Sequence, residues 1–115
     1  MTTEAIAAYF QAIRDRNADA LLDLFTDDAQ LTTVTGTYRG HDEIVGFYRD
    51  LAFSIADLWP EPGPLIVDDD RVAVEIDLTM GGATTKVADV FTMRGDRIAR
   101  LAIYSGPAVT DTRTG

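Results

Sequence analysis

The sequence predicts an α+β fold in which helices come first and an antiparallel sheet follows. In the first half of the chain, apolar residues recur at the i, i+3, i+4, i+7 spacing of helices that bury one face. In the second half, runs of alternating apolar and polar residues are separated by short turn sequences. A length of 115 residues provides for one hydrophobic core. We therefore expect a single domain over residues 1–115, with the helices packed on one face of the sheet.

Three helices are expected. The first covers residues 3–16, and its apolar stripe consists of Ile6, Tyr9, Phe10 and Ile13. A short second helix has Asp19 as its N-cap. Its apolar side consists of Leu21, Leu22, Leu24 and Phe25. The third helix follows Gly40 and must end before Pro60, because proline cannot donate a backbone hydrogen bond. Its apolar face consists of Ile44, Phe47, Tyr48 and Leu51.

The remaining segments have the composition of strands and turns. Residues 29–34 predict a first strand that ends before Gly36. Further strands are expected over residues 64–68, 71–80, 83–93 and 97–105. The three aspartates at 68–70 lack the ligand spacing of a calcium loop and are interpreted as a solvated turn. The polar residues from about 109 to 115 are expected to be a frayed tail.

The hairpin after residue 80 predicts which residues share a face of the sheet. If Gly81 and Gly82 form a two-residue loop, Val74 pairs with Asp89, and Lys86 pairs with Asp77. The Lys86 pair then lies on the outer face as an exposed ion pair. Asp89 falls on the other face, among apolar residues.

A carboxyl group on a buried face must be hydrogen-bonded, paired with a charge or protonated. No lysine or arginine alternates onto this face near Asp89. We therefore expect burial to raise the pKa of Asp89, which would make it a general acid or base. The alternative is a structural carboxylate that backbone amides or water molecules satisfy.

Composition and charge exclude several classes of function. The formal net charge of −9 and isoelectric point of about 4.3 disfavour binding to nucleic acids and anionic membranes. No apolar stretch reaches the roughly 20 residues of a membrane span, and polar residues follow Met1, so we expect a cytoplasmic protein. With no cysteine and one histidine, we expect neither a metal site nor a cofactor. His41, at a helix start, is expected to be exposed and to cap the helix.

Several segments, in order, resemble the nuclear transport factor 2-like (NTF2-like) superfamily, in particular its ketosteroid isomerase and SnoaL-like polyketide cyclase branch. They are residues 23–29, the spacing of Gly40, Ile44 and Phe47, residues 88–91, Arg97-Ile98 and Ile103-Tyr104. The resemblance implies a cone-shaped, curved antiparallel sheet wrapped around the N-terminal helices, a cystatin-like roll with an apolar pocket.

The resemblance also implies roles for individual residues. Ketosteroid isomerases bind an enolate oxygen with a helix tyrosine and a protonated strand aspartate, positions that Tyr9 and Asp89 occupy here. The position of their proton-transferring base is filled by Thr33, which cannot take up a proton near neutral pH. SnoaL-like cyclases use a pocket aspartate as acid and base, a role that Asp89 can fill.

We therefore expect a pocket protein that acts on a hydrophobic carbonyl or epoxide substrate as an isomerase, cyclase or hydrolase. Asp89 and Tyr9 are the expected catalytic residues. The residues expected to contact substrate are Thr33, Tyr38, Phe47, Tyr48, Trp59, Val74, Phe91, Leu101 and Ile103. The alternative is a non-catalytic ligand-binding or dimerisation module, with Tyr9 and Thr33 in structural roles.

A homodimer is expected as well. The outer face of the sheet carries Val90, Ala99, Ala102 and Tyr104 alongside charged residues. The superfamily that the chain resembles commonly pairs sheet to sheet.

Overall fold

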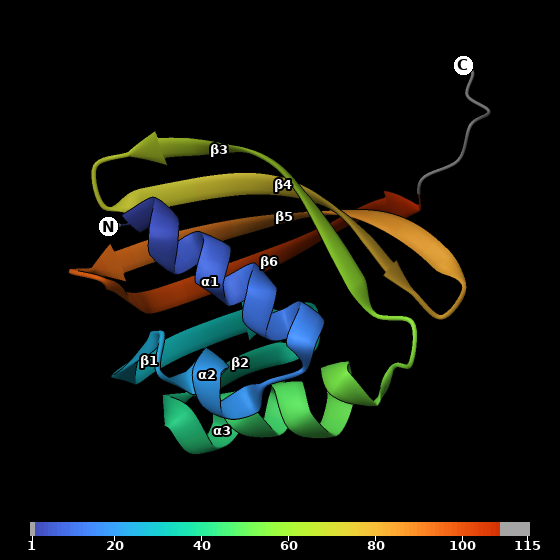
Figure 1. Ribbon diagram of the computed structural model, residues 1–115, viewed down its shortest axis with the longest axis horizontal. Coiled ribbons are helices and arrows are strands. Elements are labelled where there is room, and N and C mark those ends of the chain that lie inside the picture. The colour runs from blue at the N-terminus through green and yellow to red at the C-terminus, as the bar shows by residue number, and fades with distance from the viewer. Residues whose placement is uncertain (1, 109–115) are drawn as a thin grey trace.

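The computed structural model describes residues 2–108 as a curved six-stranded sheet with helices against one face (Figure 1). The chain begins with helices α1 (Thr2–Asp15) and α2 (Ala18–Leu22) and strands β1 (Phe25–Thr33) and β2 (Gly36–Arg39). Helix α3 (Gly40–Gly46) continues into a π-helical turn, η1 (Phe47–Leu51), and a 3₁₀ turn, η2 (Ala52–Ser54). The last strands are β3 (Trp59–Asp68), β4 (Arg71–Met80), β5 (Ala83–Arg94) and β6 (Arg97–Ala108). The predicted α+β order is confirmed.

The sheet is open and has the strand order β2-β1-β6-β5-β4-β3. Strands β3 to β6 form an antiparallel meander, and β1 and β2 form an antiparallel hairpin. Strand β1 runs parallel to β6, so the sheet contains one parallel pair that the sequence did not predict. After β2, at one edge, the chain passes through α3, η1 and η2 and starts β3 at the opposite edge.

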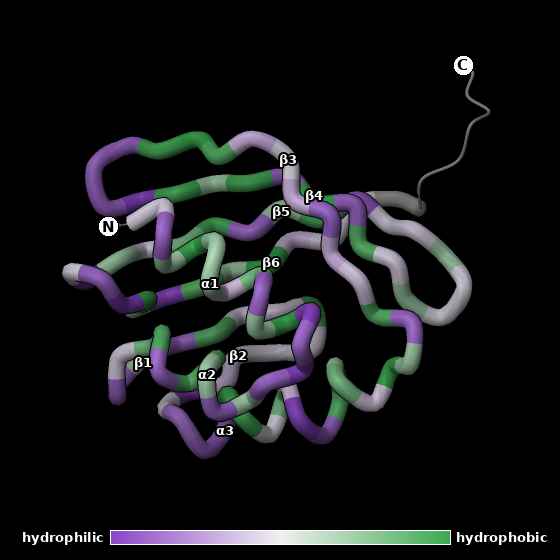
Figure 2. Tube along the Cα trace, viewed as in Figure 1, coloured by the Kyte–Doolittle hydropathy of each residue, from purple (hydrophilic) through white to green (hydrophobic). Residues whose placement is uncertain are grey.

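Helix α1 lies across the concave face of the sheet, in front of β5 and β6 (Figure 1). Its predicted apolar stripe is buried, with Ile6 1% exposed and Tyr9 3% exposed. Helix α3 packs mainly against β1 and β2. Polar residues gather in the turns, such as the one between β3 and β4, and apolar residues recur along β4 and β5 (Figure 2). The concave face of the sheet therefore forms the core together with the helices.

The predicted register of the β4–β5 hairpin is confirmed. Val74 pairs with Asp89, and Asp77 pairs with Lys86. The Lys86 ammonium lies 2.7 Å from the Asp77 carboxylate, and both side chains are about half exposed. The two-residue loop requires positive φ angles, which the two glycines supply at 62° and 81°.

The boundaries of α2 and β1 differ from the prediction. The N-cap of α2 is Asn17, whose side chain accepts a hydrogen bond from the Ala20 amide at 3.1 Å, so the prediction of Asp19 was wrong. Phe25, expected on this helix, begins β1 instead and is fully buried. An isolated apolar run does not distinguish a helix end from a strand start, because both bury the same side chains.

Strand β3 begins five residues earlier than predicted, at Trp59, although it contains three prolines. It is an edge strand of the sheet. Proline has no amide hydrogen to donate. On an edge strand, a proline whose nitrogen faces solvent removes no hydrogen bond to the neighbouring strand. Residues 36–39 also form a strand, β2, that the sequence did not predict.

Two other expectations concern the surface and the end of the chain. The aspartates at 68–70 lie at the β3–β4 turn, where Asp69 has a positive φ of 55°. The expected tail over residues 109–115 lies outside the described residues. Within residues 2–108, no helix is long and apolar enough to cross a membrane.

Candidate functional site

Two buried tyrosine hydroxyl groups meet at the centre of the helical side of the core. Tyr9 lies in the middle of α1, and Tyr48 lies in the π-helical turn η1. Their oxygens are 2.6 Å apart, a short hydrogen bond in which either group can donate. Both residues are nearly fully buried, and π-helical turns often occur where a functional side chain is placed. Tyr9, which the sequence predicts to be a catalytic residue, is thus hydrogen-bonded to a second buried hydroxyl group.

Asp89 lies on β5 and points to the same interior. It is 3% exposed and stands between Val74 of β4 and Ile103 of β6 in the sheet. Among residues 2–108, no side chain forms an ion pair with its carboxyl group. Burial raises the pKa of Asp89 to about 7. The pKa of Asp89 is therefore shifted upward, as predicted, because the buried carboxyl group loses its hydration.

The three groups are electrostatically coupled. Burial raises the pKa of Tyr9 well above its ordinary value, and the neighbouring Tyr48 and Asp89 raise it further. Burial likewise raises the pKa of Tyr48, and Asp89 adds to this rise, whereas the hydrogen bond from Tyr9 lowers it. Both tyrosines therefore stay protonated at neutral pH. Only one of their two protons is used in the mutual hydrogen bond, so the second hydroxyl group can donate to another oxygen.

Most of the residues predicted to contact substrate surround these three groups. Val74, Phe91 and Leu101 are fully buried, and the Phe91 ring lies 5.2 Å from the Tyr9 ring, edge to face. Four others are half-buried at the margin of the core, namely Thr33, Tyr38, Phe47 and Ile103. The Phe47 ring lies between those of Tyr38 and Tyr48, at 5.0 and 5.1 Å from them.

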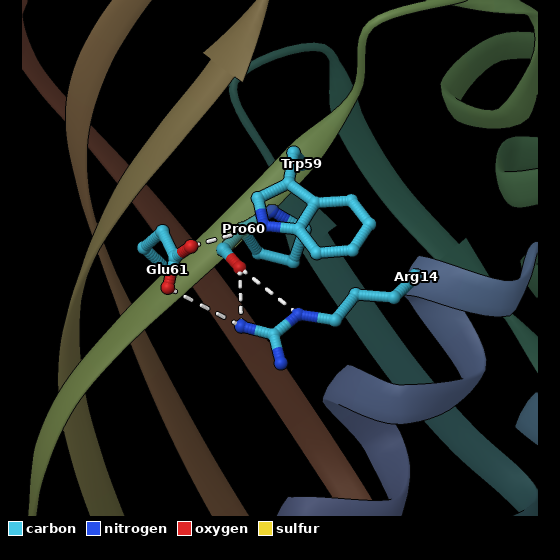
Figure 3. A network of polar contacts seen from close by, with 4 residues as sticks. All are labelled: Arg14, Trp59, Pro60 and Glu61. Atoms are coloured by element: carbon cyan, nitrogen blue, oxygen red, sulfur yellow. Dashed lines mark hydrogen bonds and ion pairs between the residues drawn. The ribbon is translucent and has the colours of Figure 1, made fainter.

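Trp59 does not line this interior, contrary to the prediction. Its neighbour Pro60 is buried and pairs with Leu78, whereas Trp59 lies at the edge of the sheet and is 43% exposed. The Arg14 guanidinium lies 5.1 Å from its ring centre and also donates to the Pro60 carbonyl (Figure 3). The indole nitrogen donates to Glu61. Trp59 therefore helps to attach β3 to α1.

His41 is half-buried and does not cap α3. Its Nε2 atom lies 3.1 Å from the Phe25 carbonyl oxygen, across from the start of β1. The N-cap of α3 is Arg39, which forms no side-chain cap. His41 thus connects α3 to β1, because the start of β1 runs beside this helix.

Two hollows of the surface lie away from Asp89. One, of about 440 Å³, is lined by residues 15–19, where α1 meets α2, together with Arg49. Another, of about 30 Å³, lies on the outer face of the sheet beside Tyr104. The interior around Asp89 is instead occupied by side chains, among them Phe91 and Leu101.

The hydroxyl pair itself could not be found from the sequence. Tyr48 was predicted as a substrate contact, but its partner is 39 positions away in the chain. The available signal was that both tyrosines fall on apolar helix faces, where a phenol needs a hydrogen-bond partner.

Comparison with known proteins agrees with this architecture. Among solved structures, a candidate polyketide cyclase from Sinorhizobium meliloti is 25% identical, with a TM-score of 0.81, and the match covers 87% of this chain and 93% of that one. A protein with a ketosteroid isomerase-like fold from Catenulispora acidiphila, solved with trimethylamine, is 23% identical, with a TM-score of 0.80, and coverage of 90% and 86%. An NTF2-like protein from Cytophaga hutchinsonii is 14% identical, with a TM-score of 0.81, and coverage of 93% and 91%.

The expected NTF2-like fold is thereby confirmed. No curated protein matches the sequence significantly. A family model described as the SnoaL-like domain matches residues 6–101, which is most of the chain and includes Tyr9, Tyr48 and Asp89. The chain therefore belongs to the SnoaL-like family.

Proposed function

We propose that the chain catalyses proton transfer next to the carbonyl group of a small hydrophobic molecule, as an isomerase or an aldol-type cyclase does. The observation that carries this proposal is a buried carboxyl group, Asp89, coupled to the Tyr9–Tyr48 hydroxyl pair. Enolisation of a carbonyl compound needs a group that moves a proton and donors that stabilise the oxygen that becomes negative.

The proposed reaction uses Asp89 in both of its protonation states. Its ionised form takes a proton from the carbon beside the carbonyl, the C–H electron pair forms a carbon–carbon double bond, and the carbonyl electrons move to oxygen. The tyrosine pair donates a hydrogen bond to this enolate oxygen. Protonated Asp89 then returns the proton, either to another carbon or to the alkoxide that forms when the enolate attacks a second carbonyl. A pKa of about 7 suits both steps near neutral pH.

A single carboxyl group must take and return the proton in this scheme. Thr33, at the position where the isomerases carry their base, has a hydroxyl group that is hydrogen-bonded to Thr35 at 2.8 Å. Family membership supports the proposal, as does the likeness to a candidate polyketide cyclase, because cyclisation of a polyketide is carbonyl chemistry of this kind.

The test is a screen of hydrophobic enones, β-keto esters and epoxides with wild type and three variants. Asp89→Asn should lower the turnover rate by about 10² to 10⁴, the usual contribution of a general acid or base. Tyr9→Phe should lower it by about 10² to 10³, the usual contribution of one donor to the negative oxygen, and Thr33→Val should change it least.

Wild-type turnover by Asp89→Asn would show that this mechanism is wrong. Conversion of epoxides alone would instead indicate a hydrolase. Melting curves of each variant provide the control for correct folding.

A non-catalytic ligand-binding module is the second candidate. It is favoured by the filled interior, since Phe91 and Leu101 have no exposed surface and Val74 has 1%. A binding module would bind compounds of the same screen in calorimetry and release them unchanged.

A further inference from the structure

Two arginines lie in one row across the outer face of the sheet. Arg71 of β4 pairs with Thr92 of β5, and Thr92 pairs with Arg100 of β6. Residues that are paired across strands point to the same face, so the two arginines flank Thr92. Two strand spacings separate their Cα atoms, roughly 10 Å. Both arginine side chains are exposed.

The two guanidinium groups have no acidic partner within residues 2–108. No carboxylate in this range forms an ion pair with either of them. Even Asp68, the residue opposite Arg71 on β3, does not form one. On a chain with a formal net charge of −9, these arginines therefore form a local positive patch that is available to an external anion.

A small hollow lies between the arginines and an apolar patch. Its volume is about 30 Å³, and it is lined by Arg71, Val90, Thr92, Arg100, Ala102 and Tyr104. Val90 and Ala102 pair with each other in the next row of the same face. Tyr104 is 59% exposed and lies two residues beyond Ala102 on β6. The hollow thus combines two cations and two hydroxyl groups with apolar surface.

The size and charge of the hollow favour one kind of ligand group. A water-sized oxygen atom needs about 10–15 Å³ of such space, so the hollow accepts a group of about two oxygens. A carboxylate has two oxygens in one plane, and they match the planar donors of a guanidinium group. The remainder of the ligand must lie outside the hollow, where the exposed Tyr104 ring offers it a flat apolar surface.

We propose that Arg71, Thr92 and Arg100 bind the carboxylate of a small aromatic acid. The ring of the acid lies against Tyr104, over the apolar surface of Val90 and Ala102. This site is on the opposite face of the sheet from Asp89 and is independent of the proposed function. A second copy of the chain on this face would cover the hollow, so the acid and the homodimer that the sequence predicts exclude each other.

The experiment is an NMR titration of the full chain with benzoate at constant ionic strength. Benzoate should shift the amide signals of Val90, Thr92 and Ala102 and reach saturation, whereas benzamide, which has no charge, should not. Arg71→Gln and Arg100→Gln should each weaken benzoate binding about 10-fold or more, the usual effect of a lost hydrogen bond to a charged group. Arg100→Lys keeps the charge without the planar donors and should give an intermediate affinity.

Two comparisons test the specificity of this effect. Arg49→Gln is the matched control, because it removes the same charge from an exposed side chain on the helical side, where Arg49 lies 3.8 Å from Asp19. It should leave the affinity for benzoate unchanged. Acetate has no ring and should bind to wild type about 2- to 10-fold more weakly than benzoate. Tyr104→Ala should remove most of this difference.

Three results would overturn the proposal. The first is the absence of saturable benzoate binding to wild type; a dimeric mass in light scattering would then identify a second copy as the occupant of this face. The second is an unchanged affinity in both Arg71→Gln and Arg100→Gln. The third is an equal affinity of wild type for benzoate and inorganic phosphate, which would show a general attraction of anions to the arginines.

Discussion

Burial, rather than a neighbouring charge, sets the acidity of Asp89. The residue is 3% exposed, and its pKa rises to about 7. In an unfolded chain the pKa of an aspartate is about 3.9. Folding therefore favours the protonated form. This contribution to stability is complete below about pH 3.9 and is lost as the pH rises through about 7.

We expect Asp89→Asn to fold normally and to be at least as stable as wild type at pH 7. The amide has nearly the shape of the protonated carboxyl group and does not ionise, so the variant escapes a loss of a few kcal/mol, at about 1.4 kcal/mol per pH unit. As the pH rises from about 4 to about 8, the melting temperature of wild type should fall relative to that of the variant. A clearly lower melting temperature of the variant at pH 7 would mean that ionised Asp89 is paired and structural.

The hydroxyl pair of Tyr9 and Tyr48 should show a non-additive effect on stability. Replacing either tyrosine by phenylalanine leaves the other hydroxyl group buried without its partner, which costs about 1–3 kcal/mol. Replacing both removes the two polar groups together, so the double variant should lose less than the sum of the single losses. Urea unfolding of the four proteins measures this difference. Additive losses would show that the two groups do not depend on each other.

At the scale of elements, a carboxylate ties the β4–β5 hairpin to the segment before β3. Asp57 accepts hydrogen bonds from the Gly81 and Gly82 amides, at 2.7 and 2.8 Å. The neighbouring Arg16 donates to the carbonyl oxygens of residues 55, 56 and 58. This segment follows the turns that carry Tyr48 and Phe53, whose rings lie 5.9 Å apart. The hairpin contact therefore helps to hold the helical side of the site in place.

Asp57→Ala should release the hairpin loop and leave the core folded. The two glycine amides lose their acceptor, so their hydrogen exchange should become faster, whereas Asp57→Asn keeps one acceptor oxygen and should give a smaller change. The hydrogen bonds from the Gly82 and Gly81 amides lower the pKa of Asp57. The contact in wild type should therefore persist above the unfolded value of about 3.9 and weaken as the pH falls through the lowered pKa.

Exchange measured by NMR at the two glycine amides provides the readout. Equal exchange rates in wild type and Asp57→Ala would show that the hydrogen bonds do not restrain this loop.

On the scale of the whole molecule, the outer face of the sheet carries a row of apolar residues with charged residues beyond it. Ala73, Val90 and Ala102 lie side by side in the middle of this face. Arg71 and Arg100 lie beyond this row at one end, beside Thr92. Glu75 and the exposed Tyr104 lie beyond it at the other end, on either side of Ala88. Ala99, also expected on this face, falls at the β-bulge of β6.

We expect a homodimer through this face. A two-fold axis through the apolar row would place the arginines of one copy opposite Glu75 of the other. Val90→Glu puts a charge into the apolar row and should produce a monomer, measured by light scattering at tens of micromolar protein. Val34→Glu is the control, because Val34 is 77% exposed at the β1–β2 turn, away from this row. A monomeric mass of wild type under these conditions would contradict the prediction.

Local patterns predicted most of the fold. The strands of the second half, the first helix and the position of Asp89 followed from periodicity and turn residues. Strand β2 was missed because its four residues show no clear alternation of apolar and polar side chains. The early start of β3 was missed because this strand contains prolines, which strands usually lack.

The sequence by itself determined the face on which Asp89 lies. Side chains alternate with a period of two, so a two-glycine loop between two strands settles every pair along β4 and β5. Only the tertiary structure decided that Tyr48 meets Tyr9, that Trp59 lies against Arg14, and that β1 runs parallel to β6. These contacts join segments far apart in the chain. They depend on how the helices cross the sheet, which no local period of the sequence specifies.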